Sequence, residues 1–123
     1  MLLRALLPGD PWHLACKPEP GIDAYVVERE GQPVVMFLII QAGLPEVHMA
    51  IRRGCASYLK RAAAILRAHL MMQHPEWKGV WTWVCSAKME RVAKRFGFRV
   101  AAIAPDGHIY LYHSFGRRTS PCP

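Results

Sequence analysis

Hydrophobic residues are grouped in short runs along the chain, and clusters of glycine, proline and charged residues separate these runs. The runs are rich in β-branched and aromatic residues, which favours β-strands because such side chains pack well on a pleated surface. They predict strands at residues 1–7, 24–29, 34–41, 46–51, 80–85, 99–104 and 109–115. The run at 34–41 is almost wholly apolar, so we expect it to be a central strand covered on both faces.

Residues 57–73 carry apolar side chains at helical spacing, and a His-Pro pair follows them. The predicted apolar stripe comprises Leu59, Ala62, Ala63, Leu66 and Leu70. Pro75 disfavours helical backbone at the residue before it, so this helix is expected to end near His74.

A second helix is predicted directly after the strand at 80–85. Ser86 is a good N-cap for it, and Gly97 can adopt the left-handed conformation that ends a helix. The predicted apolar face consists of Met89, Val92 and Phe96. A basic face at the same spacing consists of Lys88, Arg91 and Arg95.

The length of 123 residues corresponds to one domain with a sizeable core. We expect residues 1–115 to form this domain and the polar, proline-rich residues 116–123 to form a flexible tail. The formal net charge of +7 favours an anionic partner, such as a phosphorylated cofactor, nucleic acid or an acidic protein. The sequence has no apolar run of membrane-spanning length, no secretory signal pattern and no paired cysteines, so we expect a cytoplasmic protein.

The strand, cap, helix and Gly97-Phe98 ending between residues 80 and 98 resemble the last conserved segment of the GNAT family of N-acetyltransferases. An Asn usually caps this helix in the family, and Ser86 stands in its place here. The predicted order of strands and helices, with a short helix at 12–17, is also that of GNAT proteins. The resemblance covers roughly residues 24–115. It implies an α/β fold with a mixed, mostly antiparallel sheet flanked by helices, and with a shortened N-terminal helical region.

The pattern also resembles the small GNAT-like internal virion proteins of short-tailed phages. In those proteins a Trp-rich strand leads into a capped helix, and an Asp-Gly turn precedes the last strand. Trp81, Trp83 and the turn at Asp106-Gly107 match these features here. This second resemblance implies phage structural proteins as partners and the host cytoplasm as the location.

The GNAT resemblance implies a site for acetyl-CoA. In the family a strand opens away from its neighbour and leaves backbone groups free to bind the amide arm of coenzyme A, and the next helix N-terminus binds the pyrophosphate. The family's phosphate loop reads Arg/Gln-x-x-Gly-x-Gly/Ala. Gly54 and Ala56 match its second half, whereas Ile51 stands where Arg or Gln is usual and the arginines occupy the next two positions. The alternative is a shortened connection with a solvated arginine pair.

By this resemblance, the backbone of the strand at 46–51 would hold the pantetheine arm. The residues implied for the arm are Met49, Ala50 and Ile51. Those implied for the pyrophosphate are Arg53, Gly54, Cys55, Ala56 and Ser57. Ser86 would lie within reach of the cofactor, although capping alone accounts for a serine at this position.

Transfer of an acetyl group to an amine needs a base for the amine proton and an acid for the leaving thiolate. Many GNAT proteins carry a Glu on the strand before the phosphate loop, and Glu46 begins that strand here, one residue out of register. A one-residue shift turns a side chain to the other face unless a bulge corrects it. His48 is the second candidate base, because an ordinary histidine pKa suits proton uptake near neutral pH. The alternatives are a solvated carboxylate and a partly exposed sheet histidine.

The usual GNAT acid is a Tyr four residues before the glycine that ends the helix, and this position is Ala93 here. Together with the altered loop, this favours the alternative of a catalytically degenerate GNAT-fold protein that acts in virion assembly or as a protein-interaction module. The histidines and cysteines lack the spacing of metal ligands, so we expect no metal site. The basic residues lack a nucleic-acid-binding signature and are interpreted as a solvated helix face.

The sequence therefore predicts an acetyl-CoA-dependent N-acyltransferase whose acceptor is an amine on a small molecule or a protein. A strand amide near Met49 or Ala50 would stabilise the thioester oxygen. An exposed sheet edge next to the shortened N-terminal region favours a homodimer.

Overall fold

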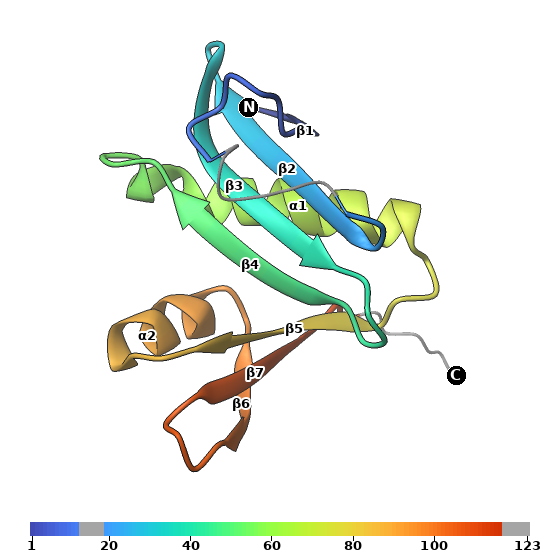
Figure 1. Ribbon diagram of the computed structural model, residues 1–123, viewed down its shortest axis with the longest axis vertical. Coiled ribbons are helices and arrows are strands. Elements are labelled where there is room, and N and C mark those ends of the chain that lie inside the picture. The colour runs from blue at the N-terminus through green and yellow to red at the C-terminus, as the bar shows by residue number, and fades with distance from the viewer. Residues whose placement is uncertain (13–18, 117–123) are drawn as a thin grey trace.

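The computed structural model describes residues 1–12 and 19–116 (Figure 1). The short helix predicted at 12–17 and the tail predicted at 116–123 lie almost entirely outside the described residues. Within the described part, seven strands form one sheet in the order β1-β2-β3-β4-β5-β7-β6. Neighbouring strands are antiparallel except β4 and β5, which are parallel. The predicted mixed, mostly antiparallel sheet flanked by helices is confirmed.

The strands are short, and most of their bounds agree with the predicted runs. They are β1 Leu2–Ala5, β2 Ile22–Arg29, β3 Gln32–Ile40, β4 Glu46–Ile51, β5 Gly79–Val84, β6 Arg99–Ile103 and β7 Ile109–Ser114. A 3-10 turn at Ala56–Tyr58 leads into helix α1, Leu59–Gln73, and helix α2 spans Ala87–Arg95. The hairpin turn expected at 30–33 is shorter than predicted, because Gln32 already belongs to β3.

Both helices cover the same face of the sheet. Leu66 of α1 and Ala93 of α2 belong to one core cluster, in which they pack with strand residues such as Phe37. Figure 1 shows α1 crossing β2 and β3, whereas α2 lies beside β5. The main core therefore lies between the sheet and the two helices, and its burial stabilises the arrangement of β4 and β5.

The other face of the sheet carries a smaller apolar cluster. Val26 and Met36 are its buried members, and Leu6, Trp12 and Leu38 pack against them. Segments from the shortened region between β1 and β2 thus cover part of β2 and β3. β3 is buried along most of its length, in agreement with the prediction of a central strand.

The ends of α2 follow the sequence signals closely. The Ser86 hydroxyl oxygen accepts a hydrogen bond from the Met89 N–H at 3.2 Å, which confirms the predicted N-cap. Gly97 has φ +92°, in the left-handed region that favours glycine, and ends the helix as predicted.

The predicted inward face of α2 needs one correction. Met89 is 38% exposed, whereas Ala93 is 4% exposed and Val92 and Phe96 pack against the core. Met89 lies in the first turn of α2, which follows the end of β5 at Val84, where β5 no longer pairs with β4. The apolar face of α2 is therefore confined to its second half.

Among residues 1–12 and 19–116, no helix is both long and apolar enough to cross a membrane. No group of three or more His, Cys, Asp or Glu side chains in that part of the chain is placed to hold a metal ion.

Candidate functional site

The parallel strands β4 and β5 touch at one end and diverge at the other. Their ladder contains the pair Glu46 and Trp81, and the Trp81 N–H donates to the Pro45 carbonyl at 3.0 Å. Beyond this pair β4 and β5 separate, as Figure 1 shows. Within residues 1–12 and 19–116, one edge of β4 is thus left without a neighbouring strand along most of its length.

The free edge of β4 can be assigned to particular residues. β4 pairs with β3 in a regular ladder without a bulge, and the Arg52 N–H donates to the Val34 carbonyl at 2.9 Å. Backbone groups alternate in direction along an antiparallel strand, so those of Ala50 also point towards β3. The groups of Met49 and Ile51 point towards the open edge. Of the three residues implied for the pantetheine arm, Met49 and Ile51 therefore offer free backbone groups and Ala50 does not.

The connection from β4 to α1 is a tight turn around Gly54. This residue has φ +82°, and an added Cβ would meet no atom within 4 Å. The Cys55 N–H donates to the Arg52 carbonyl at 2.9 Å, which closes the turn. Among the described residues, no hydrogen-bond partner is found for the N–H groups of Arg53, Gly54, Ala56 and Ser57. These donors, beside two exposed arginines, could bind an anion.

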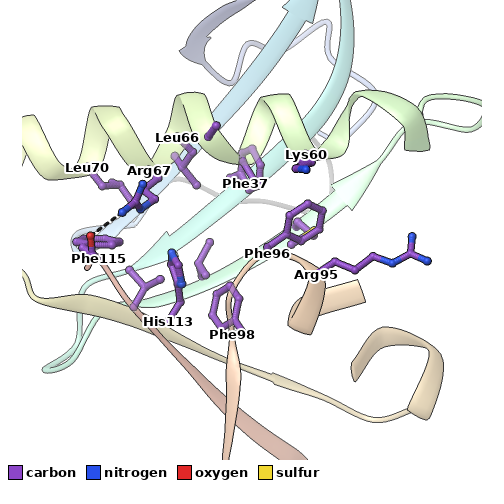
Figure 2. A pocket seen from close by; sticks show the side chains of 15 residues that line it. Phe37, Lys60, Leu66, Arg67, Leu70, Arg95, Phe96, Phe98, His113 and Phe115 are labelled. Atoms are coloured by element: carbon purple, nitrogen blue, oxygen red, sulfur yellow. Dashed lines mark hydrogen bonds between the residues drawn. The ribbon is translucent and has the colours of Figure 1, made fainter. Parts of the chain in front are cut away.

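An apolar pocket of about 250 Å³ lies between α1 and α2, on the helix-covered side of the splay (Figure 2). The side chains of Val47 and Met49 line it from β4, which places the pocket beside the open strand edge. Lys60 of α1 and Arg95 of α2 line it near the N-terminal end of α1. The pocket thus adjoins the free backbone groups, and Lys60 and Arg95 supply positive charge at this end.

The end of the pocket away from Lys60 is formed mainly by buried apolar side chains. Figure 2 shows Leu70 and Phe115 at this end, where the Arg67 guanidinium donates to the Phe115 carbonyl at 2.6 Å. His113 also lines it, and burial lowers the pKa of this histidine below its ordinary value. The ring of His113 is therefore neutral near neutral pH.

The opposite face of the splay carries both candidate catalytic residues. Glu46 and His48 lie on the same face of β4, and one carboxylate oxygen of Glu46 bonds to the His48 Nε2. The same oxygen accepts a hydrogen bond from the Trp83 Nε1–H at 3.1 Å. The Glu46 side chain is only 17% exposed. The alternative of a solvated strand-end carboxylate therefore does not describe Glu46.

This arrangement fixes the hydrogen-bonding role of His48. A carboxylate can only accept hydrogen bonds, so the His48 Nε2 donates to Glu46 when the ring is neutral. The neutral ring then presents Nδ1 as an acceptor. The Trp83 ring packs edge-on against His48, with centroids 5.3 Å apart, and restrains the imidazole from one side.

A second histidine–carboxylate pair lies on the other side of Trp83. The rings of Trp83 and His108 are 4.8 Å apart in an edge-on arrangement, and the His108 Nδ1 lies 2.8 Å from an Asp106 carboxylate oxygen. The His108 backbone N–H donates to Asp106 at 3.0 Å, and this bond, with the nearby imidazole, lowers the pKa of Asp106. No role was predicted for this pair from the sequence. The Asp-Gly turn signal placed Asp106 at a hairpin tip, but nothing in the sequence placed that tip beside Trp83.

The remaining predicted site residues lie around the open end of the splay. Ser86 begins α2 there, and its hydroxyl already accepts the capping hydrogen bond. Cys55 is partly buried against the main core. Ala93, at the position of the usual GNAT acid, is 4% exposed and has no side-chain donor.

Comparison with known proteins gives a fold but no family assignment from sequence. No protein-family model matches the chain, and no curated protein matches it.

Solved structures match it well in three dimensions. The N-acetyltransferase PseH of Campylobacter jejuni superposes with a TM-score of 0.66 at 8% identity, over 78% of this chain and 70% of PseH. Aminoglycoside 6'-acetyltransferase type Ii gives a TM-score of 0.66 at 14% identity, over 81% of this chain and 73% of that enzyme. The chain has the GNAT fold.

A third GNAT structure matches this chain along nearly its whole length. This is a GNAT family acetyltransferase from Elizabethkingia anophelis with acetyl-CoA bound, with a TM-score of 0.66 at 11% identity. The match covers 92% of this chain and 97% of that protein. At such identities the likeness establishes the GNAT fold alone.

Proposed function

We propose that the chain is an acetyl-CoA-dependent N-acyltransferase that acetylates an amine. The observation that carries the proposal is the free edge of β4 beside a pocket between α1 and α2, within a GNAT fold. The Elizabethkingia structure with this fold contains acetyl-CoA.

The residues around the splay fit coenzyme A in three respects. The backbone groups of Met49 and Ile51 are free to bind the amides of the pantetheine arm. The N–H groups of Arg53, Gly54, Ala56 and Ser57 have no partner among the described residues and suit the pyrophosphate. Lys60 and Arg95 add positive charge beside the pocket, and the net charge of +7 favours an anionic ligand.

The chemistry needs little from the protein beyond positioning and proton transfer. Acetyl-CoA supplies the acetyl group as an activated thioester, and its reaction with an amine gives an amide and a free thiol. His48 Nδ1 receives the proton that the acceptor amine gives up. Glu46 positions the imidazole through Nε2 and stabilises its charged form, as in other carboxylate–histidine pairs. A backbone N–H on the free edge, such as that of Met49, stabilises negative charge on the carbonyl oxygen.

The two faces of β4 separate donor and acceptor. The side chains of Val47 and Met49 line the pocket, whereas those of Glu46 and His48 lie on the opposite face. The donor and the amine would therefore approach from opposite faces and meet at the open edge. Carboxylates and the Trp83 ring on the acceptor face suit a cationic amine. Structures of the aminoglycoside acetyltransferase AAC(6')-Ib with ribostamycin and coenzyme A support a small-molecule acceptor.

One observation favours the second candidate, a GNAT-fold protein without activity that acts as an interaction module. Ala93 occupies the usual acid position, and no tyrosine or carboxylate lines the pocket in the described part of the chain. In the enzyme, solvent would have to protonate the leaving thiolate.

Calorimetric titration with coenzyme A and acetyl-CoA separates the two candidates. We expect saturable 1:1 binding with micromolar affinity, followed by thiol release when an amine panel is supplied. Absence of binding at millimolar ligand would overturn the enzyme proposal and favour the interaction module. Binding without thiol release from any amine would favour a cofactor-binding protein that has lost catalysis.

A further inference from the structure

Exposed basic side chains surround the open end of the splay and continue along α2. Lys88, Arg91 and Arg95 recur at positions i, i+3 and i+7, so they share one side of this helix, the basic face of α2. The face begins beside the pocket at Arg95 and extends about 10 Å towards the N-terminus of α2, at the helical rise of 1.5 Å per residue. Across the open end, Lys60 of α1 and Arg53 of the turn after β4 are also exposed.

These cations have no acidic partner in the described part of the chain. The salt bridges found within residues 1–12 and 19–116 involve no side chain of the basic face of α2, and neither Lys60 nor Arg53. Lys94, on another side of α2, is instead paired with Glu90 at 2.7 Å. No acidic side chain lines the adjoining pocket in the described residues. The open end therefore carries uncompensated positive charge, which favours an anionic partner there.

The pocket and the basic face would contact different parts of a donor. The pocket lining on α1 extends from Lys60 to Leu70, about 15 Å at the helical rise, which is comparable to the length of a pantetheine arm. With a volume of about 250 Å³, the pocket suits this arm alone and not the group that carries it. Lys88 and Arg91 do not line the pocket, so they would contact that carrying group. Figure 2 shows the Arg95 side chain pointing away from the cavity.

Two kinds of donor present the same phosphopantetheine arm. In coenzyme A the arm is joined to a nucleotide, and in an acyl carrier protein it is joined to a small acidic protein. The free N–H groups around Gly54 suit the phosphate of either donor. A nucleotide places its charge at this turn, whereas an acidic protein covers a wide surface. A row of unpaired cations that leads away from the pocket along α2 therefore favours the protein.

We propose that an acidic acyl carrier protein delivers the donor, docking on the basic face of α2 while its arm enters the pocket. This inference rests on the proposed function, because it requires the same arm at the free edge of β4. The amine nitrogen bonds to the acyl carbon as the carbon–sulfur bond breaks. The carrier leaves with a free thiol, since the proton lost by the amine reaches the thiolate through His48 and solvent. Coenzyme A thioesters then enter the same pocket with lower affinity.

Calorimetry with acetyl-CoA and with a purified acidic acyl carrier protein, in acetylated and apo forms, tests the inference on binding alone. We expect the acetylated carrier to bind about tenfold or more tightly than acetyl-CoA at low salt, and the apo form, which lacks the arm, to bind more weakly. Equal or weaker binding of the acetylated carrier than of acetyl-CoA would overturn this inference and leave the proposed function intact. Equal binding of the apo and acetylated forms would also overturn it, because the arm would then lie outside the pocket. Failure of every ligand to bind would overturn both proposals.

Arg91→Glu reverses a charge on the basic face of α2 outside the pocket. It should weaken binding of the acetylated carrier about tenfold or more and leave acetyl-CoA affinity unchanged. Lys78→Glu is the matched control, because it changes the net charge equally at an exposed residue that precedes β5 at the closed end of the splay. Equal losses in both variants would reduce the effect to net charge and overturn docking on α2.

A single-stranded RNA oligonucleotide tests the competing class of anionic partner. We expect it to bind wild type more weakly than the acetylated carrier does at the same salt concentration. Tighter binding of the oligonucleotide that is lost in Arg91→Glu would assign the basic face of α2 to nucleic acid and overturn the inference.

Discussion

A single carboxylate oxygen of Glu46 organises the acceptor face, because it bonds to both His48 and Trp83. Neither bond could be predicted from the sequence, which gave Glu46 and His48 as separate candidates. The alternation along β4 put both on one face, but the contact with Trp83 depends on how β4 and β5 join. β4 has no bulge that would correct the one-residue offset of Glu46 from the position of the family's Glu.

Glu46→Gln tests the positioning role. A glutamine amide can donate to the His48 Nε2 and so reverse the tautomer, which removes Nδ1 as the proton acceptor. We expect turnover to fall by about 10²–10⁴-fold, with coenzyme A affinity unchanged in calorimetry. Glu76→Gln, at a side chain that is 68% exposed, is the control. Wild-type turnover in Glu46→Gln would exclude this role.

Gly97→Ala tests a close contact between the end of α2 and β7. An added Cβ would lie 2.8 Å from the His113 Cε1, and φ is +92°. Gly107 has the same φ with no atom within 4 Å of its added Cβ, so Gly107→Ala isolates the backbone strain. We expect Gly107→Ala to lower the free energy of unfolding by about 1–2 kcal/mol. Gly97→Ala should lower the free energy of unfolding, measured by urea denaturation, by about 1–3 kcal/mol more than Gly107→Ala does. Equal losses would show that His113 moves aside freely.

Among the elements, the turn between β4 and α1 determines whether the anion site exists. Its glycine was recognised in the sequence from a partial match to the GNAT loop. The structure adds the positive φ of Gly54 and the free N–H groups around it.

Gly54→Val should abolish coenzyme A binding while the protein stays folded. A β-branched side chain is strained at φ +82° and would displace the amides of the turn. Gly31→Val is the matched control, since Gly31 has φ +78° in a hairpin turn and its added Cβ also meets no atom within 4 Å. We expect similar losses of stability in both variants and loss of calorimetric binding in Gly54→Val alone. Unchanged binding in that variant would remove the turn from the site.

Most elements were predictable because their signals are local. The strand at 46–51 was predicted with its observed bounds, since a Pro45 turn precedes it and the Gly54 turn follows it. Met89 was misplaced because helical spacing cannot show where the sheet beneath a helix opens. The pocket between α1 and α2 was not predicted for the same reason, since it depends on residues far apart in the chain.

At the scale of the whole molecule, stability should depend on pH through His113. Burial lowers its folded pKa below the ordinary 6.5, so the unfolded chain takes up a proton first as the pH falls. The contribution of the neutral ring is complete above pH 6.5 and is lost progressively below it. The lowered pKa of Asp106 acts in a separate window, below its ordinary 3.8.

We expect the free energy of unfolding in urea to be lower at about pH 5.5 than at about pH 7.5, by an amount that His113→Gln largely removes. Glutamine does not titrate, so the variant should be less stable at the higher pH but should depend less on pH. An unchanged slope in the variant would show that His113 is not the responsible group.

The narrow join between β4 and β5 also divides the chain into two consecutive blocks. Residues up to Ile51 supply β1 to β4, residues from Gly79 supply β5 to β7, and α1 is the covalent link between them. A molecule bound along the free edge of β4 would serve as the strand that is missing there. Binding would then join the two blocks into one cooperative folding unit. Both the steepness and the midpoint of the unfolding transition would therefore change when the cleft is filled.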